Sequence, residues 1–97
     1  MTELSKIQAL ADEELKEANE KYQLFHSYHE AYAVILEEFE ECSEEVSGMS
    51  LWIAKMWEKI RDNDEIESTM TAIKYHALHA AAEAIQVAAM CDKAVMK

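Results

Sequence analysis

The sequence has no proline and only one glycine, Gly48. Proline ends helices and glycine weakens them, so a chain with almost neither offers few points at which a helix must stop. The remaining composition is rich in alanine, leucine, methionine, glutamate and lysine, which favour helix. We therefore expect an all-α fold. The 97 residues predict one domain, residues 1–97, near the lower size limit for a self-sufficient core.

Basic residues are also scarce. Nine lysines and arginines stand against 20 aspartates and glutamates, and the formal net charge is −11. Proteins bind nucleic-acid backbones through lysine and arginine, so this balance argues against direct nucleic-acid binding. It allows metal binding or, as a non-catalytic alternative, an acidic binding protein that acts as a DNA mimic or helical adaptor. Carboxylates spread along an exposed surface would favour mimicry, whereas carboxylates converging in a hollow would favour catalysis.

Cysteines and long apolar runs are few. Cys42 and Cys91 lack CxxC spacing and fall on apolar helical stripes, so we expect reduced core residues and a cytoplasmic location. No segment approaches the ~18 apolar residues of a membrane span, and the N-terminus lacks the basic and apolar parts of a signal peptide. The sequence therefore predicts a protein that interacts with no membrane and is not processed.

Apolar residues at intervals of three and four predict four helices that pack as a four-helix bundle. The first helix covers residues 4–25. The second begins at a capping box, residues 27–30, where the Ser27 oxygen and the Glu30 carboxylate satisfy free backbone amides. It runs to about residue 46. Its expected core-facing stripe is Tyr32, Ile35, Leu36, Phe39, Cys42 and Val46.

Gly48 is expected to end the second helix, because glycine readily adopts the left-handed conformation found after many helices. Ser50 then caps a short third helix. The residues of that helix expected to face inward are Trp52, Ile53, Met56 and Ile60.

A polar joint at residues 61–64 leads into the long last helix. This helix has two apolar faces, and we expect the second to form a subunit interface that completes the small core in a homodimer or homotetramer. The residues of the second face are Leu78, Ala82, Ile85 and Ala89.

An acidic run, Glu37-Glu38-Phe39-Glu40-Glu41, lies on the predicted second helix. Carboxylates three residues apart lie on one helix face, so Glu38 and Glu41 can hold one divalent cation. Glu83, isolated among alanines on the last helix, can complete the site. A solvated helix face is the alternative for the acidic run, and a surface position is the alternative for Glu83.

A second metal-binding pattern involves His76 and His79, one helical turn apart, with Glu83 four residues further on. These three side chains can form a transition-metal site on one helix face, and surface or hydrogen-bonded packing histidines are the alternative. The Glu-x-x-His pairs of a ferritin-like di-iron bundle do not occur.

The two acidic segments, residues 29–41 and 83–90, resemble those of MazG-like all-α nucleoside triphosphate pyrophosphohydrolases, particularly short phage-encoded members. The first resembles the family's EExxE helix and the second its other acidic helix, and together they cover about a fifth of the chain. The resemblance implies hydrolysis of a nucleoside triphosphate, with ribose or deoxyribose, to a monophosphate and pyrophosphate. It also implies Mg²⁺ as cofactor, with Mn²⁺ as a substitute.

Individual roles follow from the same resemblance. The implied metal ligands are Glu38, Glu41, Glu83 and Gln86. Glu37 would orient or deprotonate the attacking water. The expected substrate contacts, His29, Trp52 and Lys74, come from residue type and position rather than from the resemblance. The alternative for Trp52 is a core or rim position, and the alternative for Lys74 is an exposed base that serves solubility or pairs with an acid. Gln86 stands where the family has aspartate, and because an amide is a weaker ligand than a carboxylate, a weakened or inactive relative is the alternative to an active enzyme.

Overall fold

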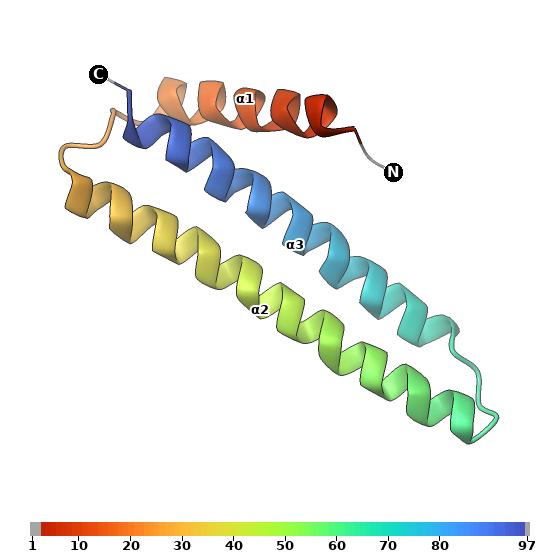
Figure 1. Cartoon of the computed structure of the whole chain (residues 1–97). Helices are drawn as coiled ribbons and strands as arrows, with labels where there is room; N and C mark the ends of the chain where they lie inside the picture. Colours follow the sequence, from red (N-terminus) through yellow and green to blue (C-terminus); the bar gives the residue numbers. More distant parts are fainter. Residues whose placement is uncertain (1–2, 97) are drawn as a thin grey trace.

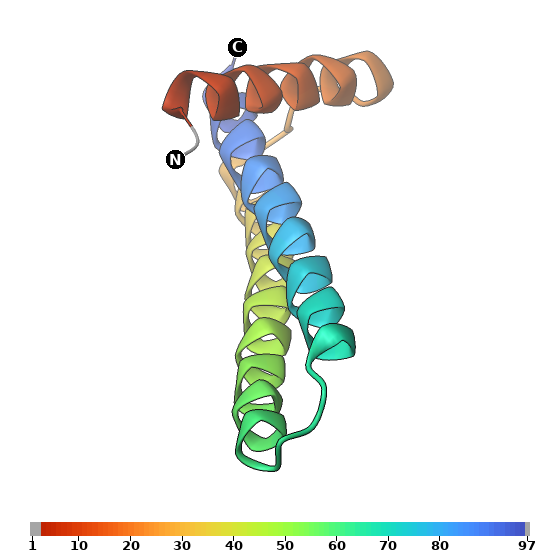
Figure 2. The ribbon, with the colours of Figure 1, turned by 90° about the vertical axis from the view of Figure 1, so that its right-hand side faces the viewer.

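The computed structural model describes residues 3–96, and the regular secondary structure in that range is entirely helical. Helix α1 covers Leu4–Lys21, α2 covers Tyr28–Arg61 and α3 covers Glu67–Ala94. Helices α2 and α3 form a long antiparallel hairpin, and α1 lies across α3 near the C-terminal end of that helix (Figures 1 and 2). The all-α prediction is confirmed, but residues 3–96 form three helices rather than four.

The predicted break at Gly48 is wrong, because α2 continues through Gly48 and Ser50. Gly48 does not adopt a positive φ, so it is not a left-handed helix cap. One glycine in a helix interior costs about 1 kcal/mol relative to alanine, a penalty that packing along α3 offsets. A Cβ atom built on Gly48 would lie 2.7 Å from Cε1 of His76. The glycine therefore leaves room for the His76 ring where the two helices approach closely.

The predicted start of α2 is confirmed. Ser27 Oγ accepts a hydrogen bond from the backbone N–H of Glu30 at 3.1 Å. The Glu30 carboxylate does not complete a capping box but lies 3.1 Å from Nδ1 of His26. Helix α1 ends at Lys21, earlier than expected, so residues 22–27 connect α1 to α2.

The predicted polar joint between the last two helices is also confirmed. Its residue Asn63 has a φ of 56°, a left-handed conformation that asparagine tolerates better than most residues. Glu65 then accepts a hydrogen bond from the backbone N–H of Glu67 at 2.7 Å, and this bond lowers the pKa of the Glu65 carboxyl. The carboxylate thereby satisfies a free amide in the first turn of α3.

The hairpin seam is the line along which α2 and α3 face each other. Its residues recur every seven positions on each helix, and all are buried or half-buried. We define the seam by Ala31, Glu38, Glu45, Trp52 and Lys59 on α2, with Thr69, His76, Glu83 and Met90 on α3.

The seam lies one residue before the core stripe that the sequence predicted for α2. One residue corresponds to a rotation of about 100° around a helix. Two consequences follow: Glu38 and Glu45 enter the hairpin, and much of the expected core faces outward. The expected core residues that are exposed are Tyr32, Phe39, Val46, Ile53 and Ile60.

Two further expectations about the core need correction. Cys42 is half-buried and its Sγ donates to the Ala80 carbonyl at 3.4 Å, but Cys91 is exposed, and both thiols are free. The second face of α3 is partly covered within the chain, since Ala89 is fully buried while Leu78 is exposed. Over the described residues, no helix is long and apolar enough to cross a membrane.

Candidate metal and ligand site

Three glutamates from the two helices of the hairpin converge in its α1-bearing half. Glu38 and Glu41 of α2 and Glu83 of α3 each place a carboxylate oxygen so that the three lie within 4.8 Å of one another. Glu38 and Glu83 are half-buried in the seam and Glu41 is exposed. Within residues 3–96, no other group of three or more metal-binding side chains meets this criterion. We call these three residues the acidic cluster.

Hydrogen bonding, burial and neighbouring negative charges raise the pKa of two carboxyls in the acidic cluster. A side-chain hydrogen bond with Glu83, followed by the negative charge of Glu83, raises the pKa of Glu41. Burial raises the pKa of Glu83, and the hydrogen bond with Glu38 and the charges of Glu38 and Glu45 add to this. The fully ionised cluster is therefore unfavourable until a proton or a cation neutralises part of its charge. Its hard oxygen donors suit Mg²⁺ or Mn²⁺.

Glu37 lies beside the acidic cluster, whereas Lys74 lies on the opposite side of α3. Glu37 is exposed next to the acidic cluster, and its charge contributes to the raised pKa of Glu41. Lys74 precedes Glu83 by nine residues, which corresponds to half a turn around α3 and about 13 Å along it. The structure therefore brings Glu37 to the acidic cluster and leaves Lys74 on the far side of the helix.

Gln86 is bonded to α1 rather than placed among the acidic cluster. Its Nε2 donates to Oε2 of Glu14 at 3.0 Å, a contact between residues 72 positions apart. Helix α1 thereby brings a carboxylate beside the position where the MazG-like pattern has aspartate. Glu14 was not predicted as a site residue, because the spacing of residues within α1 does not indicate where that helix crosses α3.

A pocket of about 360 Å³ opens beside the acidic cluster, and Glu38 and Gln86 both line it. Lys93 also lines this pocket, although only 4% of the surface of this residue is exposed. Its Nζ lies 4.9 Å from the ring centre of Phe25 and 6.0 Å from that of Tyr22. Within residues 3–96 it forms no ion pair. A largely buried lysine whose ammonium group lies beside aromatic rings and forms no ion pair suits an anionic group of a ligand.

Lys93 was missed because a lysine in the last turn of a helix usually interacts with the helix dipole and solvent. One signal in the sequence points to it. Lys93 follows Gln86 by seven residues, a spacing that places the two side chains on the same face of α3.

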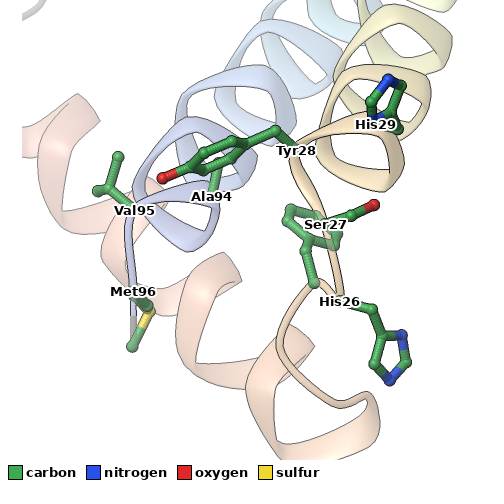
Figure 3. Close-up of a pocket in the computed structure, with 8 residues that line it drawn as sticks. His26, Ser27, Tyr28, His29, Ala94, Val95 and Met96 are labelled. Atoms are coloured by element: carbon green, nitrogen blue, oxygen red, sulfur yellow. The ribbon is translucent and has the colours of Figure 1, made fainter.

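A larger hollow of about 490 Å³ lies where the connection between α1 and α2 meets the end of α3 (Figure 3). Tyr28 reaches toward Ala94 and Val95 in this view, whereas the His26 ring points away from them. None of the residues that line the hollow is a carboxylate. We place the candidate site in the smaller pocket, because that pocket contains Glu38 of the acidic cluster.

Two other expected substrate contacts, His29 and Trp52, do not reach the acidic cluster. His29 is exposed at the edge of the larger hollow, nine residues before Glu38. Trp52 packs in the seam eleven residues after Glu41, about 16 Å along α2. The Nζ atom of Lys55 lies 4.5 Å from the Trp52 ring centre, so this indole is already in contact with a cation.

The structure does not assemble the histidine site either. His76 lies in the seam with its Nδ1 atom 2.7 Å from Oε2 of Glu45. His79 is exposed, and its ring lies against Tyr75 with 4.2 Å between ring centres. Instead of forming a transition-metal site, His76 is a hydrogen-bonded packing residue and His79 is a surface residue.

Comparison with known proteins identifies no family for this chain. No protein-family model, curated protein or solved structure matches it. The resemblance to MazG-like enzymes therefore rests on the residues of the two acidic segments.

Proposed function

We propose that the protein is a Mg²⁺-dependent nucleoside triphosphate pyrophosphohydrolase that works in the cytoplasm and accepts Mn²⁺ as a substitute. The observation that carries this proposal is the convergence of the acidic cluster beside a pocket containing the buried Lys93. Of the three carboxylates, that of Glu38 lines this pocket, and carboxylates that converge beside a hollow favour catalysis. A nucleic-acid mimic needs carboxylates spread along a surface and has no use for a largely buried lysine next to them.

The acidic cluster fits the proposed ion because Mg²⁺ prefers hard oxygen ligands and is commonly held by few carboxylates and several waters. When bound, the ion would neutralise phosphate charge and lower the pKa of a bound water. Glu37 would orient the attacking water or accept its proton. The water oxygen would form a bond to the α phosphorus while the bond from that phosphorus to the bridging oxygen breaks. The products are a nucleoside monophosphate and pyrophosphate.

Lys93 is the best-placed cation for a phosphate group of the substrate. It lines the same pocket as Glu38, so a phosphate chain bound by Lys93 would extend toward the acidic cluster. The Gln86 and Glu14 pair would supply a further negative charge close to Glu83, where the family has an aspartate. Contacts from His29, Trp52 and Lys74 stay predictions, and each of these residues lies outside this pocket.

The test is pyrophosphate release from a panel of ribo- and deoxyribonucleoside triphosphates, with Mg²⁺ or Mn²⁺. Glu38→Gln and Glu83→Gln each remove one carboxylate of the acidic cluster, and we expect both to abolish metal-dependent turnover. Glu40→Gln is the matched control, because it removes the same charge from an exposed residue that α2 turns away from α3. Circular dichroism would establish that every variant keeps its helical content.

Each outcome of this assay has a distinct meaning. Loss of turnover in the two cluster variants but not in Glu40→Gln would establish the hydrolase and identify its substrate. No turnover on any nucleotide by the folded native chain would replace the hydrolase with the non-catalytic acidic binding protein. Equal turnover by all variants would refute the role of the acidic cluster.

A further inference from the structure

An uncharged face runs along one side of the α2/α3 hairpin, although 30% of the residues of the chain are charged. Its residues recur every seven positions on both helices. The five residues on α2 are between 43% and 68% exposed. We call it the apolar face and define it by Tyr32, Phe39, Val46, Ile53 and Ile60 on α2, with Met70, Ala77, Ala84 and Cys91 on α3.

Both rows of the apolar face lie on the same side of the hairpin. Each of the nine residues follows a seam residue by one position, a rotation of about 100° around its helix. Because α2 and α3 run antiparallel, the same rotation turns both rows to the same side. The hydrogen bond from Cys42 Sγ to the Ala80 carbonyl, at 3.4 Å, joins the two helices along this side.

Helix α1 and the acidic cluster belong to the other side of the hairpin. Glu41 and Gln86 each follow a seam residue by three positions, which corresponds to a rotation of about 60° in the opposite sense. The bond between Gln86 and Glu14 of α1 agrees with this placement. Helix α1 therefore leaves the apolar face uncovered, and a partner on that face would leave the acidic cluster and its pocket open.

The amount of exposed surface indicates a partner of substantial size. The chain exposes 7373 Å², whereas a compact monomer of 11.1 kDa exposes about 5,700 Å², so the excess is roughly 1,700 Å². Its radius of gyration is 17.1 Å, against about 12.5 Å for a compact chain of this length. If two chains each buried such an excess, they would bury about 3,400 Å² together, within the range of obligate homodimers.

We propose that the apolar face is the interface of a homodimer in which two hairpins stack as a four-helix bundle. The α2 row of one chain would pack on the α3 row of its partner. The side chains complement each other, because large residues such as Phe39 and Val46 line α2 whereas alanines occupy the middle of the α3 row. Stacking each α2 on the other α2 would place large residues against large ones.

The hairpin also defines the register of this dimer. Glu38 lies level with Glu83 in the acidic cluster, and Glu45 lies level with its hydrogen-bond partner His76. A two-fold axis parallel to the helices preserves these levels between the two chains. Phe39 would therefore meet Ala84 of the partner subunit, because the two residues lie one position to either side of the Glu38 and Glu83 level, about 3 Å apart along the helix axis.

The first test is the molar mass of the chain by sedimentation equilibrium at 1–100 μM. We expect about 22 kDa for the native dimer, twice the 11.1 kDa of one chain. Phe39→Glu should raise the dissociation constant about 100-fold or more, because it buries an unpaired charge in the interface. Leu51→Glu is the matched control, since Leu51 is 56% exposed like Phe39 but precedes a seam residue and so faces the other side. A monomeric native chain, or equal effects of the two substitutions, would overturn the proposal.

A cross-link tests the arrangement even if Phe39→Glu fails to fold. Phe39→Cys and Ala84→Cys are combined in a chain carrying Cys42→Ser and Cys91→Ser. Within one chain, positions 39 and 84 lie on neighbouring helices whose axes are about 8–10 Å apart, and neither position points at the other helix, so the two new thiols are too far apart for a disulfide. Mild oxidation should therefore produce a covalent dimer, and Leu51→Cys with Ala84→Cys should not. Absence of the covalent dimer would overturn the proposed packing. Neither test uses a nucleotide, so failure of the hydrolase proposal leaves both results interpretable.

Discussion

Replacing Gly48 by alanine would test the close contact between α2 and α3 with a substitution whose two main effects have opposite signs. Alanine is favoured over glycine in a helix interior by about 1 kcal/mol. The added Cβ atom would lie 2.7 Å from Cε1, 2.8 Å from Nδ1 and 3.0 Å from Nε2 of His76. Since these distances are shorter than van der Waals contact, the imidazole ring must move.

Movement of the ring breaks a hydrogen bond. Nδ1 of His76 lies 2.7 Å from Oε2 of Glu45, and the two side chains are 23% and 25% exposed. A hydrogen bond to a charged group contributes about 1.5–3 kcal/mol, and partial exposure favours the lower end of that range. After the gain from helix propensity is subtracted, we expect Gly48→Ala to destabilise the fold by about 0.5–1 kcal/mol.

A double-mutant cycle with His76→Ala measures this coupling. Urea unfolding followed by circular dichroism, at one chain concentration, provides the four free energies of unfolding. Without the imidazole, alanine at position 48 should stabilise the fold by about 1 kcal/mol, so the coupling energy is roughly 1.5–2 kcal/mol. Destabilisation of similar size in both backgrounds would refute the reasoning, because a glycine that ends a helix would behave in that way.

Three further predictions concern the acidic cluster and its pocket. Burial and neighbouring carboxylates raise the pKa of Glu83 in the folded chain. Between the pKa of Glu83 in the unfolded chain and its raised pKa in the folded chain, the folded chain holds a proton that the unfolded chain has lost. The melting temperature of the native chain should therefore fall as pH rises through this interval. Glu83→Gln should flatten this decline in melting temperature, and Glu40→Gln should not. The stabilisation of the native chain by Mg²⁺ should become smaller as pH falls, because protons compete with the cation for the carboxylates. Lys93→Met should raise the KM for the nucleotide about tenfold or more without lowering the free energy of unfolding. A lower free energy of unfolding with an unchanged KM would instead assign Lys93 a structural role.

Several features of the fold could be predicted because they depend on neighbouring residues. The lack of proline and the apolar spacing predicted helices, and the Ser27 oxygen caps α2 as expected, because a cap involves residues within one turn. The continuation of α2 through Gly48 was not predictable in the same way. A glycine is compatible with a helix end or with a helix interior, and the choice depends on His76, 28 residues further along the chain.

The candidate site likewise combines features that local helical geometry predicts with features that depend on tertiary contacts. The spacing of Glu38 and Glu41 was sufficient to place them on one helix face, because helical geometry is local. Lys93 and Glu14 were not predicted, because their relation to the acidic cluster depends on where α1 crosses α3 and on a hydrogen bond between residues 72 positions apart.

The sequence by itself determined that this protein is helical, where α2 begins and that α2 carries an apolar residue at every seventh position. Only the tertiary structure decided which of two adjacent rows on α2 meets α3. Both rows repeat every seven residues, so periodicity alone does not distinguish them. The row that meets α3 contains Glu38, and the neighbouring apolar row stays exposed. Packing of the two helices therefore determined both the site of the acidic cluster and the face open to a partner.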